Sequence, residues 1–298
     1  MAGVSRQDVP IHICGLIPVY NNPMTLERVV SRVQAYLDTV IIVDDGSTDD
    51  TRSIAERLAA DSAMQVYLKR LPRNSGKGAA VQAGQQLALE NGFTHALQVD
   101  ADGQHNLEDI PQFIARAQEN PRALIAGSPV FGADIPAVRR HGRKLTTLVT
   151  AIEAGSLSLP DAMCGFRIYP LAAILSLGRI SKRMIYDPEV LVRASWAGIP
   201  IVTVATRVRY LSAEEGGVSH FRMVRDNVIN VFVHGWLMLQ APLRWVLRAS
   251  RVKHSRANGL QPASAAVHRQ LRSWCGSAGA GSAGWSGCCC TRLCCISC

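Results

Sequence analysis

Two aspartates lie one residue apart where a hydrophobic stretch ends. The sequence LQVDADGQH covers Leu97–His105, and Asp100 and Asp102 follow its apolar residues. Charged groups are costly to bury unless they are paired or bound to a metal ion. Two carboxylates in this spacing can both face one divalent ion, and such hard oxygen ligands suit Mg²⁺ or Mn²⁺. The simpler alternative is a turn with solvated acids, because Asp and Gly favour turns.

A second pair of acids ends another apolar stretch. Asp44 and Asp45 close TVIIVDD, and GSTDDT follows. Acids placed between a strand and a helix can accept hydrogen bonds from a nucleobase or a ribose. The alternative is an ordinary strand–helix junction in which Ser47 or Thr48 caps the helix.

A glycine-rich turn supplies positive charge and backbone donors. RNSGKGAAVQAG places Lys77 at the expected start of a helix, where anions are favoured. The stretch lacks the glycine spacing of a P-loop, so a P-loop NTPase is not predicted.

The elements that must position these residues alternate over about the first 130 residues. Apolar strands are expected at residues 11–20, 39–45, 64–70, 95–100 and 123–128. Helices are expected at residues 22–38, 46–60, 74–91 and 107–120. Strands that are apolar on both faces and joined by helices predict a mostly parallel sheet in an α/β fold. Ligands of such sheets bind at the carboxyl ends of the strands, and both acidic pairs fall there.

The second half is less regular and ends in an apolar helix. We expect helices at 137–158 and 187–198, a short strand or loop at 164–170, and one or two strands at 199–211. The apolar helix at 227–247 contains Trp236, Trp245 and Arg244, with Pro242 as a possible kink. This helix is either a core helix or a helix that lies on a membrane surface.

Composition limits the function classes. The chain has 298 residues and a net charge of +9, but six Lys or Arg and no acid lie in residues 251–298. Without them the body carries about +3, so basicity does not indicate a nucleic-acid partner. Cys14 and Cys164 are the cysteines of the body, which fits a reducing compartment. We predict a catalytic domain at 1–250 and a disordered tail at 251–298. The protein is expected to be cytoplasmic, with a peripheral position on the inner face of the cytoplasmic membrane as the alternative.

Taken together and in order, four motifs resemble the inverting family 2 glycosyltransferases with the GT-A fold. They are PVYN at 18–21, DDGSTDDT at 44–51, NSGKGAA at 74–80 and DADGQH at 100–105. With DAMCGFRIYP at 161–170, the chain looks most like the dolichyl- or polyprenyl-phosphate sugar transferases. The resemblance covers about residues 11–235 and implies a nucleotide-sugar donor and a lipid-linked or glycolipid acceptor.

The resemblance also implies a role for individual residues. It assigns donor binding to Pro18, Tyr20, Asp44, Asp45, Lys77, Asp100 and Ala101. It assigns the metal ion, Mg²⁺ or Mn²⁺, to Asp100, Asp102 and Gln104. It assigns phosphate or acceptor contacts to basic residues of the second half: Arg139, Arg140, Arg167, His220, Arg222 and Arg225. Asp187, with Glu189 as second choice, is the expected general base, and Arg167 is expected to act beside it.

Several alternatives stay open at this level. Arg167 could simply pair with Asp161, and Asp187 could be a helix cap before Pro188. The subgroup often has an arginine where Pro129 stands and a serine where Cys164 stands, which bears on the lipid-phosphate acceptor. A sugar nucleotidyltransferase and a non-catalytic nucleotide-sugar-binding protein are the alternative functions.

Overall fold

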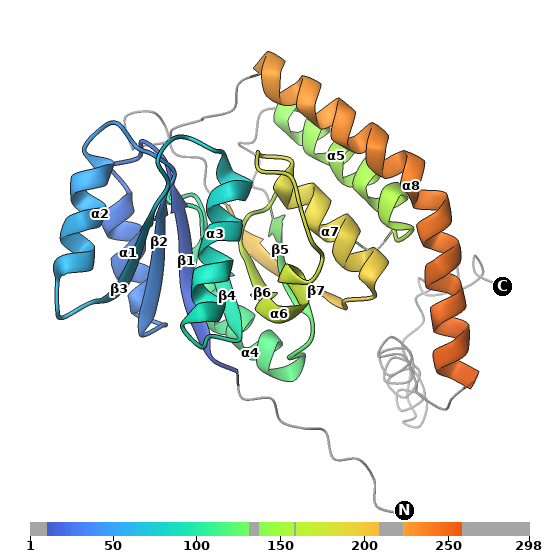
Figure 1. The fold of residues 1–298 in the computed structure, drawn as a ribbon, viewed down its shortest axis with the longest axis horizontal. Helices are drawn as coiled ribbons and strands as arrows, with labels where there is room; N and C mark the ends of the chain where they lie inside the picture. The colour runs from blue at the N-terminus through green and yellow to red at the C-terminus, as the bar shows by residue number, and fades with distance from the viewer. Residues whose placement is uncertain (1–10, 131–136, 158, 209–222, 258–298) are drawn as a thin grey trace, which may run out of the picture. The chain divides into compact units, whose positions relative to one another are not determined.

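The computed structural model describes residues 11–130, 137–157, 159–208 and 223–257 (Figure 1). The chain divides into two compact units, Met1–Ala249 and Ser250–Cys298. Only residues 250–257 of the second unit are described, as the end of a long helix. The tail that the sequence predicts to be disordered therefore lies outside the described residues from 258 onward.

A seven-stranded sheet lies at the centre of the first unit. Its strands are β1 (Ile13–Val19), β2 (Thr39–Asp44), β3 (Gln65–Arg70), β4 (His95–Gln98), β5 (Leu124–Val130), β6 (Arg167–Pro170) and β7 (Ile201–Arg207). Their spatial order is β3-β2-β1-β4-β6-β5-β7. Every neighbouring pair is parallel except the two antiparallel pairs that β6 forms with β4 and β5. The predicted α/β fold with a mostly parallel sheet is confirmed.

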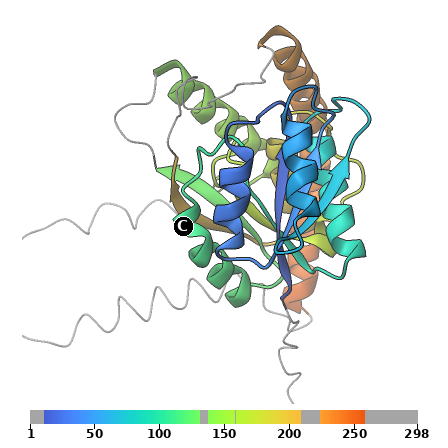
Figure 2. The ribbon, with the colours of Figure 1, turned by 90° about the vertical axis from the view of Figure 1, so that its left-hand side faces the viewer.

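Helices cover both faces of this sheet (Figure 1 and Figure 2). One face carries α1 (Leu26–Gln34), α2 (Thr51–Ala60) and α4 (Ile110–Glu119), the last preceded by the short helix η1 (Leu107–Asp109). The other face carries α3 (Lys77–Glu90), α6 (Leu171–Leu175) and α7 (Tyr186–Ala197). Neighbouring residues of β1 alternate between the two layers, with Ile17 in the first and Leu16 in the second. Burial on both sides explains why β1 and β2 are apolar throughout.

Two further helices pack beside α7. They are α5 (Ala137–Ala154) and α8 (Met223–Ala257), which meet α7 in a small cluster of Ala154, Val192, Trp196, Leu237 and Ala241. The helix expected at 137–158 ends at Ala154, where Gly155 takes a positive φ of 65°. The apolar helix expected at 227–247 is longer, and Pro242 lies inside it without ending it.

The structure corrects two local expectations. Neither Ser47 nor Thr48 caps α2, which begins at Thr51 after Asp50. The Ser47 hydroxyl instead accepts a hydrogen bond from the backbone N–H of Asn21. Strand β4 ends at Gln98, two residues earlier than expected, so the DADGQH motif lies in the loop that follows.

Candidate active site

The predicted donor-side residues meet at the carboxyl edge of the sheet. Asp44 ends β2 and pairs in register with Val19 at the end of β1, and Pro18 and Tyr20 flank Val19 in sequence. The carboxylate of Asp44 is fully buried, and its Oδ1 accepts the backbone N–H of Ser47 at 2.8 Å. Its Oδ2 has no hydrogen-bond donor in the described chain, although the Arg70 Nε lies 3.5 Å away. A buried acceptor without a donor is what a ligand N–H or O–H at this edge would satisfy.

The carboxylate of Asp45 is hydrogen-bonded to the glycine-rich turn. Its two carboxylate oxygens accept the backbone N–H groups of Ser75 and Gly76, each at 2.7 Å. Burial raises the pKa of Asp45, although these two bonds act against the rise. The predicted contact of Asp45 with the donor stays a prediction, and the observed role of its side chain is to fix the turn before α3.

Lys77 links two acids that are far apart in sequence. Its Nζ lies 2.8 Å from Oδ2 of Asp100 and 2.9 Å from Oδ2 of Asp187, with 13% of the lysine side chain exposed. Burial lowers the pKa of Lys77, but the charges of the two aspartates outweigh it and raise the pKa above its usual range. The motifs indicated both the lysine and the acids, but no spacing in the sequence indicated this bridge.

The two acids of the DADGQH motif differ in their electrostatics. Burial would raise the pKa of Asp100, but the charge of Lys77 and the hydrogen bond and charge of His105 hold it well below its usual range. For Asp102, burial and the nearby charge of Asp100 raise the pKa. Asp102 is thus a carboxylate that lacks sufficient positive charge around it in the ligand-free protein.

The donor set fits a divalent ion held by few protein ligands. Asp100 and Asp102 offer carboxylate oxygens, and Ala101 between them is buried. Gln104 approaches Asp102 with its backbone N–H, which donates to Oδ1 at 3.0 Å. Within the described ranges, no three His, Cys, Asp or Glu side chains converge on one possible metal position. Mg²⁺ and Mn²⁺ sites of this kind take further oxygens from water and from substrate phosphates.

His105 is a site residue that sequence reasoning missed. Its Nε2 lies 3.6 Å from Oδ2 of Asp100, and its Nδ1 is buried without a hydrogen-bond partner in the described chain. An isolated bridge between His105 and Val208 ties the motif to the end of β7. The position of His105 at the end of the DADGQH motif was the sequence feature that could have indicated its place in the site.

Arg167 and Asp187 do not follow the simpler alternatives. Asp161 pairs with Arg143, through bonds of 2.8 and 3.0 Å, and not with Arg167. Arg167 is fully buried and donates to the backbone oxygens of Asp187 and Ala162. Asp187 lies in the first turn of α7, which Ile185 precedes as N-cap, so Asp187 is not a helix cap. Arg167 therefore positions the start of α7, and its predicted phosphate contact stays a prediction.

Glu189, the second candidate for the general base, forms its hydrogen bonds outside the cluster around Lys77. Glu189 is 2% exposed, and its two carboxylate oxygens accept the backbone N–H of Ser181 and the Nε of Arg193. Because Asp187 contacts Lys77 and Glu189 does not, the structure favours Asp187 of the two as the acid at the site.

Because Gly165 has no side chain, the backbone before β6 can lie close to the ion pair of Lys77 and Asp100. A Cβ at this position would lie 2.6 Å from the Lys77 Nζ and from Oδ2 of Asp100. Any side chain here would displace the Lys77–Asp100 contact. The residue belongs to the quoted CGFR stretch, but its role was not predicted.

The remaining basic candidates cannot be placed by their side chains. Arg139 and Arg140 lie in the first turn of α5 and Arg225 lies in the first turn of α8, in each case with only the backbone described. His220 and Arg222 lie outside the described residues. Their phosphate contacts stay predictions.

Comparison with solved structures shows which fold this is. The fold is similar to glucosyl-3-phosphoglycerate synthase from Mycobacterium tuberculosis in complex with Mn²⁺ and UDP, with a TM-score of 0.56 and 15% identity over 76% of this chain and 80% of that one. It is also similar to a TarS fragment of S. aureus in complex with UDP-GlcNAc, with a TM-score of 0.52 and 17% identity over 78% and 67% of the two chains. The fold is thus that of the GT-A glycosyltransferases.

The chain belongs to glycosyl transferase family 2, whose sequence model matches residues 15–175. It is a glycosyltransferase, and the nucleotidyltransferase alternative is wrong.

Curated relatives confirm the resemblance to lipid-phosphate sugar transferases. A dolichyl-phosphate beta-glucosyltransferase of Trichomonas vaginalis is 27% identical over 62% of this chain and 62% of the relative. A UDP-N-acetylglucosamine–dolichyl-phosphate N-acetylglucosaminyltransferase of Methanococcus voltae is 28% identical over 58% of this chain and 74% of the relative. The polyprenol monophosphomannose synthase of Mycolicibacterium smegmatis is 34% identical over 40% and 46% of the two chains. The matched regions span about half to three quarters of these relatives.

Proposed function

We propose that this protein transfers a sugar from a nucleotide-diphosphate donor to a polyprenyl phosphate, with inversion at the anomeric carbon and with Mg²⁺ or Mn²⁺. The observation that carries the proposal is the contact of Lys77 with both Asp100 and Asp187 at the carboxyl edge of the sheet. It places a lysine and the two-aspartate motif at the edge where parallel sheets bind nucleotides.

The reaction breaks one bond and forms one bond at the anomeric carbon. The electron pair of the broken bond leaves with the nucleoside diphosphate, so negative charge grows on the diphosphate oxygens. Lys77 is a fixed cation beside that position and stabilises the developing charge. A divalent ion held by Asp100 and Asp102 supplies Lewis-acid stabilisation of the same oxygens when bound.

The acceptor decides what Asp187 does. A phosphate acceptor is already anionic and gives up no proton, so Asp187 then acts as the anion that positions Lys77 and the start of α7. A hydroxyl acceptor, as in a glycolipid, needs a base, and Asp187 is the acid at the site. The names of the relatives favour the phosphate acceptor. The departure at Cys164 does not oppose it, because this side chain is buried in the core against Gly127.

We also propose that the protein works at a membrane surface. Large apolar side chains on α8 are exposed, among them Phe232, Trp236 and Leu239, at 74%, 60% and 78%. An exposed apolar strip with tryptophan and flanking arginines is typical of helices that lie in the lipid interface. None of the described helices is long and apolar enough to cross a bilayer.

The function is tested by turnover of radiolabelled donors. UDP- and GDP-sugars are incubated with the full chain, Mn²⁺ and a detergent-dispersed polyprenyl phosphate. At least one donor should yield a polyprenyl-phosphate sugar, and a chelator should abolish its formation. Binding of donors without transfer to any acceptor would contradict the proposal. Transfer to glycolipids alone would replace the proposed acceptor.

The two carboxylates of α7 should differ sharply in their effect on turnover. We expect Asp187→Asn to lower kcat at least about tenfold, since Lys77 loses the charge of its second anchor. A loss of about 10²–10⁴ would show that Asp187 also takes a proton from a hydroxyl acceptor. Glu189→Gln, the matched neutralisation on the same helix turn, should change kcat less than Asp187→Asn. Equal losses in the two variants would contradict the assignment.

A further inference from the structure

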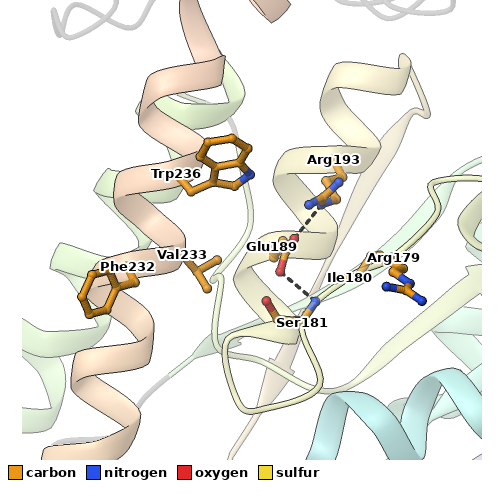
Figure 3. A pocket seen from close by; sticks show the side chains of 8 residues that line it. All are labelled: Arg179, Ile180, Ser181, Glu189, Arg193, Phe232, Val233 and Trp236. Carbon is orange, nitrogen blue, oxygen red and sulfur yellow. Dashed lines mark hydrogen bonds and ion pairs between the residues drawn. The ribbon is translucent and has the colours of Figure 1, made fainter.

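A pocket between α7, the loop before it and α8 lies outside the ion-pair cluster of the active site. Its volume is about 360 Å³, and it is lined by side chains from all three segments (Figure 3). Ligand sites usually measure roughly 300–1,000 Å³, so this one is large enough for a headgroup and a few methylenes but not for a whole lipid. Glu189 and Arg193 lie on its α7 side, and Trp236 lies on its α8 side.

The polar wall of the pocket carries net positive charge. Both oxygens of Glu189 are occupied, by the Ser181 N–H at 2.9 Å and the Arg193 Nε at 2.6 Å. The terminal nitrogens of Arg193 form no hydrogen bond within the described ranges. Arg179 is exposed, and no described side chain pairs with it. Two guanidinium groups and one carboxylate leave a charge of +1 and several N–H donors for an anion.

The opposite wall is apolar and belongs to a larger exposed surface. Phe232 and Trp236 line the pocket from α8 and are mostly exposed, as are other side chains of the same helix: Val228, Val231, Leu239, Leu243 and Val246. We call these seven residues the outer strip of α8. The inner side of the helix packs through Leu237 and Ala241. Exposed apolar surface of this extent marks an interaction site.

Charge indicates which partner covers the outer strip. The sequence of α8 contains six Lys or Arg and a single acid, Asp226. A second copy of this helix would be repelled by that charge, whereas an anionic bilayer attracts it. A molecule that fills the pocket must present an anion to the arginines and apolar carbons to the aromatic rings.

We propose that this pocket binds the phosphate headgroup and first acyl-chain carbons of an anionic phospholipid in the membrane on which the outer strip lies. Arg179 and the terminal nitrogens of Arg193 contact the phosphate, and Trp236 and Phe232 contact the carbons. The proposal rests on the proposed membrane association but not on the proposed chemistry, because the pocket is lined by none of Lys77, Asp100 or Asp187.

The first test measures binding of the full chain to vesicles of phosphatidylcholine with and without phosphatidylglycerol, by sedimentation. Arg179→Glu should weaken binding to the anionic vesicles at least about tenfold, since each basic residue near a lipid surface contributes several-fold. The matched control is Arg122→Glu, an exposed arginine before β5 that does not line the pocket. It makes the same change in net charge and should change binding less than about twofold. Equal losses in the two variants would overturn the proposal.

The second test uses calorimetry with a short-chain phosphatidylglycerol below its micelle concentration, and with inorganic phosphate. The lipid should bind at least about tenfold more tightly than phosphate, because each buried methylene adds about fourfold. Trp236→Gln should remove that advantage and leave phosphate binding unchanged, and the exposed site keeps the fold intact. Equal affinity for the two probes would show an adventitious anion only and would overturn the proposal. Transfer to polyprenyl phosphate in detergent needs no bilayer, so failure of lipid binding is distinguishable from failure of the proposed function.

Discussion

Replacing Asp102 with asparagine should reduce sugar transfer by at least about a thousandfold while leaving the protein folded. Asp102 is placed beside Asp100, and burial and the charge of Asp100 raise its pKa. Its ionised form is therefore unfavourable in the ligand-free protein and favourable only next to a cation. In the proposed mechanism Asp102 holds the divalent ion, and removal of such a group takes away several kcal/mol of transition-state stabilisation. Initial rates with saturating Mn²⁺ measure the loss.

Stability provides a second measurement for the same variant. A carboxyl whose pKa is raised on folding destabilises the protein once pH exceeds its unfolded pKa of about 3.9, so Asp102→Asn should raise the free energy of unfolding at pH 7. Wild-type protein should gain about 2.7 kcal/mol from Mn²⁺ and nucleoside diphosphate at a hundred times their Kd, and the variant should gain little. Asp38→Asn, the same change at an exposed site between α1 and β2, is the control. A full response to Mn²⁺ in Asp102→Asn would exclude this residue as a ligand.

Replacing Lys77 with methionine should cost both stability and activity. The change leaves Asp100 and Asp187 without the cation that both contact, at 2.8 and 2.9 Å. Breaking a buried ion pair by removing one partner costs about 3–5 kcal/mol. Transfer should fall about 10²–10³-fold, because the proposed mechanism uses Lys77 as a fixed cation beside the leaving diphosphate.

The stability loss of Lys77→Met should depend on pH in a defined direction. In the wild type, Lys77 holds the pKa of Asp100 low, which contributes stability above pH of about 4 that is lost as pH falls through the folded pKa. The variant lacks this contribution, so the difference between the two proteins should be nearly constant from pH 7 to about pH 4 and should shrink below about pH 4. Urea unfolding at pH 7, at about pH 4 and at about pH 2.5 measures it. Lys69→Met, at an exposed position of β3, should show little change. A difference that is independent of pH would contradict the ion-pair explanation.

Much of the fold could be predicted because its determinants are local. Apolar stretches such as TVIIVDD are buried on both faces and alternate with helices, which is sufficient for a parallel sheet. The position of β6, antiparallel between β4 and β5, could not be predicted in this way. The pairing of strands distant in sequence depends on packing of the whole sheet, and the short stretch RIYP carries no signal for its neighbours.

In the active site, too, the features with local determinants could be predicted and the contacts between distant segments could not. The acids at strand ends and Lys77 at the start of α3 follow from their motifs. Lys77 and Asp187 are 110 positions apart in the sequence, so no local spacing pattern could predict their contact. The identity of the acid that contacts Lys77 depends on the helical turn, since Asp187 and Glu189 lie on different sides of α7. The prediction that Ser47 or Thr48 caps the helix was wrong because Asn21, from the loop after β1, donates hydrogen bonds to both hydroxyl oxygens.

Contacts made by backbone atoms also determine which positions of the site can diverge. The turn before α3 is held to Asp45 by the N–H groups of Ser75 and Gly76, and α3 is joined to the loop before α7 by the bond from the Ala79 N–H to the Lys182 oxygen. Hydrogen bonds of backbone atoms do not depend on the side chain of the same residue. Substitutions at Ser75 and Lys182 should therefore leave these two bonds intact. A substitution at Gly76 should not, because an added Cβ would lie 2.5 Å from that same Lys182 oxygen. At the carboxyl edge of the sheet, positions that tolerate many residue types should therefore lie directly beside glycines that tolerate none.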